Sequence, residues 1–278
     1  MPAFICTTCG TQHADSARTP AHCAICEDER QFVGWKGQRW TTIDELRASH
    51  RNEIRPEVPG LIGIGTDPVF AIGQRALLVP HATLPMLWDC VSLVDEASVA
   101  AVRAGGGARA IAISHPHYYS AMVEWSRALG GVPVYLHEAD RAWVMRPDPA
   151  IHYWSGDALA LADGLTLLRL GGHFEGATVL HWARGSEEGA LLTGDVIQVC
   201  DDRRWVSFMY SYPNLIPLDP ATVRRIVEAV EPYPFDALCG AWWDKVIPSG
   251  AKQAVRRSAE RYVSHVRQPG TTEGTKVN

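Results

Sequence analysis

Short apolar runs separated by Gly, Asp and Pro dominate the chain from about residue 61 onward. Runs of this length, bounded by turn-forming residues, are typical of β-strands. The pattern predicts strands at 61–64, 69–72, 76–79, 84–90, 108–114, 132–137, 165–170, 178–183 and 190–196.

Helices are predicted at four places along the chain. Thr42 and Glu45 have the spacing of a capping box, so a short helix is expected to begin there. Asp219-Pro220 sets a capping residue before a proline at the first helical position, which indicates a second helix start. Helical spacing of apolar residues predicts two more, one with Met122, Trp125 and Leu129 and one with Val255, Tyr262 and Val266. Many strands followed by helices favour a layered α/β or α+β domain.

Composition narrows the class of protein. The 278 residues are 46% hydrophobic and 21% charged, as in ordinary globular proteins, and the length favours one large domain plus a small unit. The 26 basic and 31 acidic residues give a net charge of −5, so no nucleic-acid partner is expected. No apolar run reaches the roughly 18–20 residues that cross a bilayer, so no membrane partner is expected. The N-terminus lacks the pattern of a signal peptide, which favours a cytoplasmic location.

Four of the 7 cysteines lie within the first 26 residues, as two Cys-x-x-Cys pairs. Each pair can form a tight turn that directs two thiolates at one ion, and four thiolates suit zinc or, as in rubredoxin, iron. In a reducing compartment the pattern favours metal over disulfides. The alternative is a set of buried or free cysteines without metal. We expect a zinc ribbon that needs its metal to fold, with the ligands Cys6, Cys9, Cys23 and Cys26.

The domain organisation follows from these patterns. Residues 1–38 contain too few apolar side chains for a core of their own, and a Pro- and Gly-rich passage at 55–60 marks the entry into the main domain. We expect a four-cysteine zinc ribbon at 1–38, a linker helix at 39–57, a main domain at 58–267 and a flexible tail at 268–278.

A second group of chemically active residues follows the predicted strands. The apolar run before Ser114 leads straight into His115-Pro116-His117, and alternate residues at a strand end can direct two imidazoles at one ion. His173 lies in a glycine-flanked loop after another strand, and Asp195 ends a third. A single histidine is more often structural than a ligand. Together, however, these four residues indicate a metal site built from several loops.

This set of segments resembles the metallo-β-lactamase fold superfamily over roughly residues 58–265. The resemblance rests on residues 114–117, on the loop 171–176 leading into 178–182, and on 192–195, in matching order and spacing. It implies an α+β fold, an αββα sandwich with metals at one edge, here joined to a small rubredoxin-like zinc ribbon. It also implies that Asp89 does not bind the metal itself but holds the first histidine segment in position. The ribbon and the run 205–217 resemble, more closely, a bacterial subfamily of uncharacterised proteins with this fold.

The chain departs from the superfamily pattern His-x-His-x-Asp-His. Tyr119 stands at the Asp position and Ser120 at the second His position. The late histidine of the second metal site is also absent, because Cys-Gly-Ala-Trp-Trp occupies 239–243. The resemblance therefore implies a degenerate second site. We expect one zinc, or one iron or manganese, held by His115, His117, His173 and Asp195.

Three histidine ligands with an open position are typical of a catalytic metal site, where the ion lowers the pKa of its water to about 7. Asp195 either binds the ion or bonds to the water as a general base. Tyr119 either donates a hydrogen bond to an anionic intermediate or fills space. Ser120 is expected at a helix start and not as a nucleophile, because no His-Asp partner is evident for it.

Aromatic residues are concentrated at 205–213 and at Trp242-Trp243. They either line a pocket for an apolar or aromatic substrate or pack in the core. If exposed, the run 205–213 would suit a contact in a homodimer. The candidate pocket residues are Tyr118, Ser120, Tyr210, Trp242 and Trp243.

Three functions fit these observations. The first is a mononuclear metal-dependent hydrolase of an ester, thioester, lactone or amide, with a small-molecule substrate. The second is a non-catalytic binding or sensor protein that kept the fold and one metal but lost the second site. The third is redox chemistry, by analogy with flavo-diiron proteins that join this fold to a rubredoxin centre. The fold alone does not decide among them.

Overall fold

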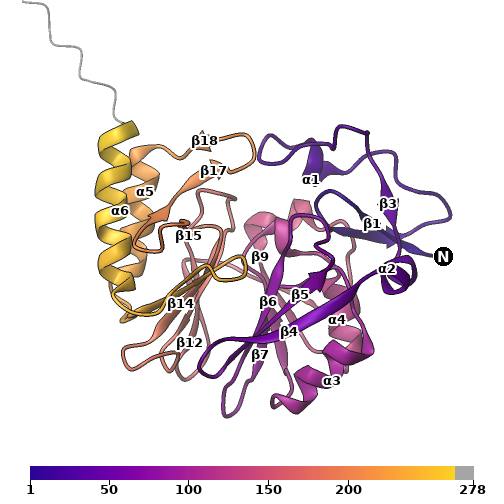
Figure 1. Cartoon of the computed structure of the whole chain (residues 1–278), viewed down its shortest axis with the longest axis horizontal. Helices are drawn as coiled ribbons and strands as arrows, with labels where there is room; N and C mark the ends of the chain where they lie inside the picture. Colours follow the sequence, from indigo (N-terminus) through magenta and orange to yellow (C-terminus); the bar gives the residue numbers. More distant parts are fainter. Residues whose placement is uncertain (267–278) are drawn as a thin grey trace, which may run out of the picture.

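Two β-sheets lie face to face between two pairs of helices in the computed structural model, which describes residues 1–266 (Figure 1). The order of layers across the molecule is helix, sheet, sheet, helix, with α5 and α6 on one side and α3 and α4 on the other. This is the αββα sandwich predicted from the sequence. The expected tail at 268–278 lies outside the described residues.

The first sheet has seven strands in the order β10-β9-β8-β7-β6-β5-β4. Strands β7 to β10 run parallel to one another, and the others pair antiparallel. The strands are β4 (Arg51–Val58), β5 (Leu61–Asp67), β6 (Arg75–Val79), β7 (Met86–Trp88), β8 (Ala110–Ala112), β9 (Val134–His137) and β10 (Ile151–Trp154).

The second sheet has six strands in the order β11-β12-β13-β14-β19-β20, with β14 and β19 parallel. These strands are β11 (Ala158–Ala162), β12 (Leu165–Arg169), β13 (Thr178–Trp182), β14 (Ala190–Gly194), β19 (Ala237–Gly240) and β20 (Val246–Ile247). Two small two-stranded sheets lie between β14 and β19 in the chain. They are β15 (Gln198–Val199) with β16 (Val206–Ser207), and β17 (Met209–Ser211) with β18 (Ile216–Pro217).

The helices of the sandwich flank these sheets on their outer faces. Asp219 caps α5 by accepting hydrogen bonds from the N–H groups of Ala221 and Thr222, as its sequence position predicted. The helical segments are α3 (Glu96–Ala104), α4 (Met122–Ala128), α5 (Pro220–Val230) and α6 (Ala251–Val266), with short 3₁₀ turns η1 (Pro116–Tyr118) and η2 (Glu138–Trp143).

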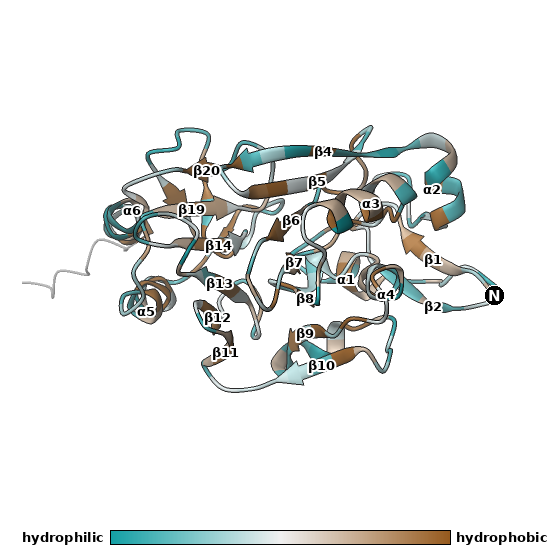
Figure 2. Ribbon diagram, turned by 90° about the horizontal axis from the view of Figure 1, so that it is seen from below, coloured by the Kyte–Doolittle hydropathy of each residue, from teal (hydrophilic) through white to brown (hydrophobic). Residues whose placement is uncertain are grey.

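Side chains alternate between two cores along each inner strand, as the period of two in a β-strand requires. In β14, Ala190 and Leu192 pack between the two sheets, whereas Leu191 packs against α5 and α6. Strands buried on both faces need nearly continuous apolar sequence. Figure 2 shows this hydropathy: β6, β14 and β19 are strongly hydrophobic, and the edge strand β4 is largely hydrophilic.

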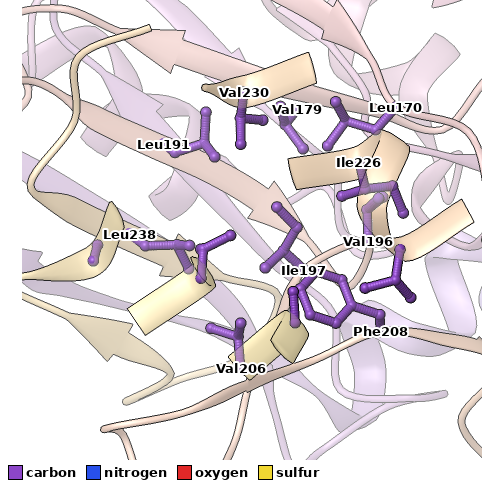
Figure 3. Packing of buried hydrophobic residues seen from close by; sticks show 14 of the residues in the cluster. Leu170, Val179, Leu191, Val196, Ile197, Val206, Phe208, Ile226, Val230 and Leu238 are labelled. Carbon is purple, nitrogen blue, oxygen red and sulfur yellow. The ribbon is translucent and has the colours of Figure 1, made fainter. Parts of the chain in front are cut away.

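The core between the second sheet and its helices is drawn in Figure 3. Leu191 and Val179 from the sheet meet Ile226 and Val230 from α5, and Phe208 closes the cluster. Phe208 is fully buried, so the run 205–213 contributes to the core of the chain. Trp205 is covered by the guanidinium of Arg261, 3.7 Å from its ring centroid. The run therefore does not provide the exposed aromatic surface expected for a homodimer contact.

Eight of the nine predicted strand segments contain a strand, and the segment 69–72 does not. There Ala71 adopts a left-handed φ of 51°, and the N–H of Gly73 donates to the carbonyl of Phe70, forming a tight turn. The segment expected as a linker helix also differs. Its helical part is α2 (Ile43–Ser49), but β4 already begins at Arg51 because Ile54 packs into the core of the first sheet.

The N-terminal unit is a three-stranded sheet in the order β2-β1-β3, followed by α2. Thr42 and Glu45 form the predicted capping box at the start of α2. The elements are β1 (Ala3–Cys6), β2 (Gln12–Asp15), α1 (Ala24–Glu27) and β3 (Trp40–Thr41). In Figure 1 this unit lies beside the β17–β18 hairpin at one edge of the sandwich. Over residues 1–266, no helix combines the length and apolar character needed to span a membrane.

The core between the two sheets should dominate stability. Leu180 is fully buried there, so Leu180→Ala should lower the free energy of unfolding by about 2–5 kcal/mol through lost burial and the cavity left behind. Leu215 is 77% exposed, so Leu215→Ala should change the free energy of unfolding by less than about 0.5 kcal/mol. Urea unfolding measures both. Equal effects of the two substitutions would contradict the assigned core.

Candidate metal centre

Strand ends from both sheets meet at one edge of the sandwich and bring the predicted ligands together. His115 follows β8 and His117 lies in η1, whereas His173 follows β12 and Asp195 follows β14. The two sheets are joined beside the site, where the N–H of Thr178 donates to the carbonyl of Ser114 over 2.8 Å. All four candidate ligands are buried.

Gly194 makes this approach of the two sheets possible. It adopts a φ of 54°, and a Cβ atom there would lie 2.6 Å from Oγ of Ser114. A side chain would therefore force the end of β14 away from the end of β8. The glycine before Asp195 lets the carboxylate reach the imidazoles that follow β8.

The ligand atoms are gathered as a bound ion would require. One atom from each of the four residues lies within 4.8 Å of every other. Nε2 of His115 lies 2.9 Å from Oδ1 of Asp195, yet neither atom has a hydrogen-bond partner. Nδ1 of His117 lies 3.3 Å from Nε2 of His173. Unpaired polar atoms are costly in a buried site, and a shared ion would give Nε2 of His115 and Oδ1 of Asp195 the partner that they lack. The residues present fit a metal ion.

Hydrogen bonds behind the ligands fix the orientation of two imidazole rings. Nδ1 of His173 donates to the carbonyl of Met209 over 3.2 Å, and Nδ1 of His115 is hydrogen-bonded to Oγ of Ser114 over 2.9 Å. Both contacts leave Nε2 free for an ion. Metal-binding histidines commonly use their second nitrogen in this way.

Asp89 takes the position expected for it behind the first histidine segment. Its Oδ1 accepts a hydrogen bond from the N–H of Ser114 over 2.7 Å. The residue has a φ of 62°, a left-handed conformation that Asp and Asn tolerate better than most residues. Burial raises the pKa of its carboxyl to about 7. The contact holds the backbone at the point where β8 turns into His115.

The electrostatics favour the protonation states that metal ligands need at three of the four residues. At His115, burial lowers the pKa of the imidazole, but Asp195 outweighs it and the pKa is raised. Burial lowers the pKa of His117 and lowers that of His173 to about 4, so both imidazoles are neutral near pH 7. Burial alone would raise the pKa of Asp195, but His115 and His173 outweigh it and hold that pKa well below its usual range. The carboxylate is therefore ionised.

A cavity of about 190 Å³ opens onto this group. Three of its lining residues are the candidate ligands His117, His173 and Asp195. The other lining residues are Gln31, Phe32, Ile72, Tyr212, Pro213 and Trp242. Trp242 was predicted, and its indole N–H donates to the carbonyl of Ile72 over 2.8 Å. Tyr212 and Pro213 belong to the aromatic run 205–213 that was also offered as a pocket wall, whereas Gln31, Phe32 and Ile72 lay outside the sequence prediction.

Four of the predicted pocket residues are absent from this lining. The hydroxyl of Tyr118 donates to the carbonyl of Ala241 over 3.0 Å, which anchors it in the core. Ser120 is buried, and its backbone carbonyl accepts from the ribbon. Tyr210 lies beneath the guanidinium of Arg30. Trp243 covers Gly63 and Gly65 of β5, where its ring leaves no space for a Cβ.

Tyr119 was predicted as a hydrogen-bond donor to an intermediate, with space filling as the alternative. The structure places it in the hydrophobic cluster beside Met122 and Trp125, with 2% of its surface exposed. Burial raises the pKa of its hydroxyl well above the usual value. It is not among the residues that line the cavity. The space-filling alternative fits this position better.

Within residues 1–266, the His-Asp group and the four-cysteine cluster are the two sets of side chains arranged to hold a metal. No residue stands beside Asp195 to complete a second ion site in this part of the chain. Cys239 is buried between the two sheets, and Trp242 lies on the cavity wall. The second site is therefore degenerate, as the sequence resemblance implied.

The four-cysteine cluster has the geometry of a zinc ribbon. Sγ of Cys6 lies 3.5 Å from Sγ of Cys26, and Sγ of Cys9 lies 3.6 Å from Sγ of Cys23. These distances are too long for a disulfide and close to the roughly 3.8 Å between sulfurs in a tetrahedron with Zn–S of about 2.3 Å. All four thiols are buried and free.

The ribbon is docked directly onto the His-Asp group. Nε2 of Gln74 donates both to the carbonyl of Cys9 and to the carbonyl of His117, over 2.6 and 3.1 Å. Arg30 donates to the carbonyl of His173 over 3.3 Å and stacks on Phe174, 4.0 Å from its ring centroid. These contacts join the ribbon to the backbone carbonyls of His117 and His173 and to the ring of Phe174.

Comparison with known proteins gives the family. No family model matches the chain. The uncharacterized protein YmaE of Bacillus subtilis strain 168 is 49% identical over 266 residues, which cover 95% of this chain and 96% of YmaE. This chain belongs to the YmaE family.

Solved structures show which fold this chain has. The mono-zinc form of the metallo-β-lactamase FIM-1 from Pseudomonas aeruginosa matches with a TM-score of 0.56 and 14% identity, over 76% of this chain and 96% of FIM-1. TTHA1623 in a di-iron-bound form matches with a TM-score of 0.50 and 22% identity, over 66% of this chain and 93% of TTHA1623. The fold is therefore that of the metallo-β-lactamases.

Because the structure has two separate candidate metal centres, we predict two bound ions per chain. Cys6→Ser should remove the ion of the ribbon, and His117→Ala should remove the ion of the His-Asp group, because each deletes one ligand. Cys200 belongs to neither cluster, so Cys200→Ser should retain both ions. Elemental analysis of the purified proteins measures this. Unchanged metal content in His117→Ala would contradict the assigned centre.

Asp89 should strengthen metal binding without touching the ion. Asp89→Ala removes the acceptor for the N–H of Ser114, so the affinity of the His-Asp group should fall by about 10–100-fold. Asp89→Asn keeps an acceptor oxygen and the left-handed preference, so its loss should be smaller. Competition with a chromophoric chelator gives the affinities. Equal losses in the two variants would show that the hydrogen bond to Ser114 is not the cause.

Proposed function

We propose that this chain is a hydrolase that holds one catalytic metal ion with His115, His117, His173 and Asp195. Its substrate is an ester, thioester, lactone or amide. The observation that carries the proposal is that three of these four residues belong both to the ligand group and to the wall of the cavity. A molecule in the cavity would therefore lie next to the ion.

The chemistry follows from the donor set. An ion bound there supplies a Lewis acid that polarises a carbonyl and lowers the pKa of water to about 7. His115 and His173 are held by Ser114 and Met209, so their Nε2 atoms stay directed at the ion. Asp195 is ionised and borders the cavity, so while one carboxylate oxygen binds the ion the other can orient the attacking water and accept its proton.

The remaining walls are suited to excluding water from the reaction. Phe32, Ile72, Pro213 and Trp242 present apolar surface beside the ligands. Electrostatic interactions are stronger where water is excluded, which helps a fixed charge act on a polarised carbonyl. Trp242 comes from the segment where the superfamily has its late histidine, so an apolar wall stands there in place of a ligand.

Zinc is the ion we propose for both centres. Four thiolates suit a structural zinc, and three imidazoles with a carboxylate suit a catalytic one. The mono-zinc form of FIM-1 and the di-iron form of TTHA1623 show that related sites in this fold take zinc or iron. Reconstitution of the metal-free protein with zinc, iron(II) or manganese, followed by activity measurement, distinguishes the ions.

A non-catalytic binding or sensor protein is the second candidate. It is favoured by the loss of the second ion site, since Tyr119 and Ser120 are buried away from the cavity lining. Redox chemistry at a diiron centre has less support, because Asp195 is the one carboxylate in the metal group of residues 1–266.

Turnover should require the His-Asp ion. A panel of a phenyl ester, an acyl thioester, a lactone and an anilide should contain a substrate whose hydrolysis is lost in His117→Ala and after chelation. Asp195→Asn should lower kcat by about 10²–10⁴-fold through loss of the proton acceptor. His152 is exposed in β10 and away from the cavity, so His152→Ala is the matched control and should keep full activity.

Either of two results would contradict the hydrolase proposal. One is turnover that persists in His117→Ala with its metal absent. The other is no turnover of any panel member by protein that carries a full complement of metal. The second result, with tight binding of a carbonyl compound, would favour the non-catalytic alternative.

A further inference from the structure

Outside the metal group, Gln31 is the residue of the cavity wall, within residues 1–266, whose side chain has a buried polar atom without a hydrogen-bond partner. It belongs to the N-terminal unit and follows α1, far along the chain from His117, His173 and Asp195. Its residue surface is 4% exposed, and its amide oxygen Oε1 has no hydrogen-bond partner among the described residues. A buried unpaired acceptor is uncommon in native proteins and calls for a partner.

The backbone of Gln31 is fixed on both sides, so the residue is held in place at the cavity wall. Its N–H donates to the carbonyl of Asp28 over 3.0 Å, and its carbonyl accepts from Nδ2 of Asn214 over 2.9 Å. Asn214 also donates to the carbonyl of Glu29 over 2.8 Å. Because both main-chain groups are already used, the side-chain oxygen is the group of Gln31 that is left without a partner.

The rest of the cavity restricts what can meet this amide. No Lys or Arg belongs to the lining, so an anionic group other than one bound to the ion would have no partner. Phe32, Ile72 and Trp242 favour an apolar body. The volume of about 190 Å³ is below the roughly 300–1,000 Å³ of sites for drug-sized ligands.

We propose that Gln31 is a substrate-binding residue, whose amide oxygen accepts a hydrogen bond from an O–H or N–H group near the scissile carbonyl. The substrate class is a small, neutral carboxylic acid derivative with an apolar body and one such donor. The inference rests on the proposed function, because the ion is taken to hold the carbonyl. The zinc ribbon thus contributes a specificity residue to the site.

Product binding tests the role of Gln31 without requiring turnover. Glycolate carries a hydroxyl beside its carboxylate, and methoxyacetate carries a methyl ether there, which cannot donate. Calorimetry on the metal-loaded chain gives the dissociation constants of both. The wild-type chain should prefer glycolate, and Gln31→Leu should reduce that preference by about 3–10-fold, as expected for one lost hydrogen bond. Comparing the two proteins removes any intrinsic preference of the ion for glycolate.

Controls separate this role from a structural one. Gln31→Leu should keep both metal ions and the unfolding temperature of the wild type, and Gln31→Met serves if the leucine variant does not fold. Val33, two residues on, is 40% exposed and absent from the lining, so Val33→Ala should leave the preference unchanged. The inference is overturned if Gln31→Leu keeps the wild-type preference, if Val33→Ala shifts it equally, or if the wild-type chain binds neither acid.

Failure of the inference and failure of the proposed function give different results. Hydrolysis of phenyl glycolate, compared with phenyl methoxyacetate, is measured in parallel. If the wild-type chain hydrolyses neither ester but its glycolate preference depends on Gln31, the hydrolase proposal fails and the binding role of Gln31 holds. If both esters are hydrolysed and Gln31→Leu changes neither their ratio nor the binding preference, the hydrolase proposal holds and the inference on Gln31 fails.

Discussion

Three imidazoles and one carboxylate, buried at one edge of the sandwich, are the constraint on which the rest of the structure depends. Nε2 of His115, Nε2 of His117 and Oδ1 of Asp195 have no hydrogen-bond partner among the described residues. Leaving such groups unpaired costs about 1–3 kcal/mol each. A bound ion turns this cost into a stabilising interaction. Three features bring the ligands to this arrangement. They are the close approach that Gly194 allows, the hydrogen bond from Ser114 to Asp89, and the hydrogen bond between the two sheets at Ser114.

The two candidate metal centres are physically connected, because the ribbon and the sandwich share hydrogen bonds at the site. Gln74 bonds to the carbonyls of Cys9 and His117, and Arg30 bonds to that of His173. Gln31 and Phe32 continue from Arg30 into the cavity wall. The structure thus gives the ribbon a role in shaping the pocket, beyond the stability or docking role that small metal-bound units often have.

The sequence predicted the features that depend on local pattern. Strand positions followed from apolar runs, and the four ligands and four cysteines followed from their spacing at strand ends and turns. Contacts between distant segments could not be predicted in this way. Gln31 and His173 line one cavity only because two separate units dock, and Trp243 packs on the glycines of β5 whereas its neighbour Trp242 lines the cavity. The apolar run at 69–72 was wrongly taken as a strand, because Ala71 and Gly73 form a turn there.

The central claim is that the His-Asp group holds a single ion and that the second site of the fold is absent. Anomalous diffraction at the zinc edge from crystals of the zinc-loaded protein tests it most directly. We predict two anomalous peaks per chain, one among Cys6, Cys9, Cys23 and Cys26 and one among His115, His117, His173 and Asp195. A further peak about 3.5–4 Å from the ion of the His-Asp group, the separation typical of two-metal sites, would contradict the account.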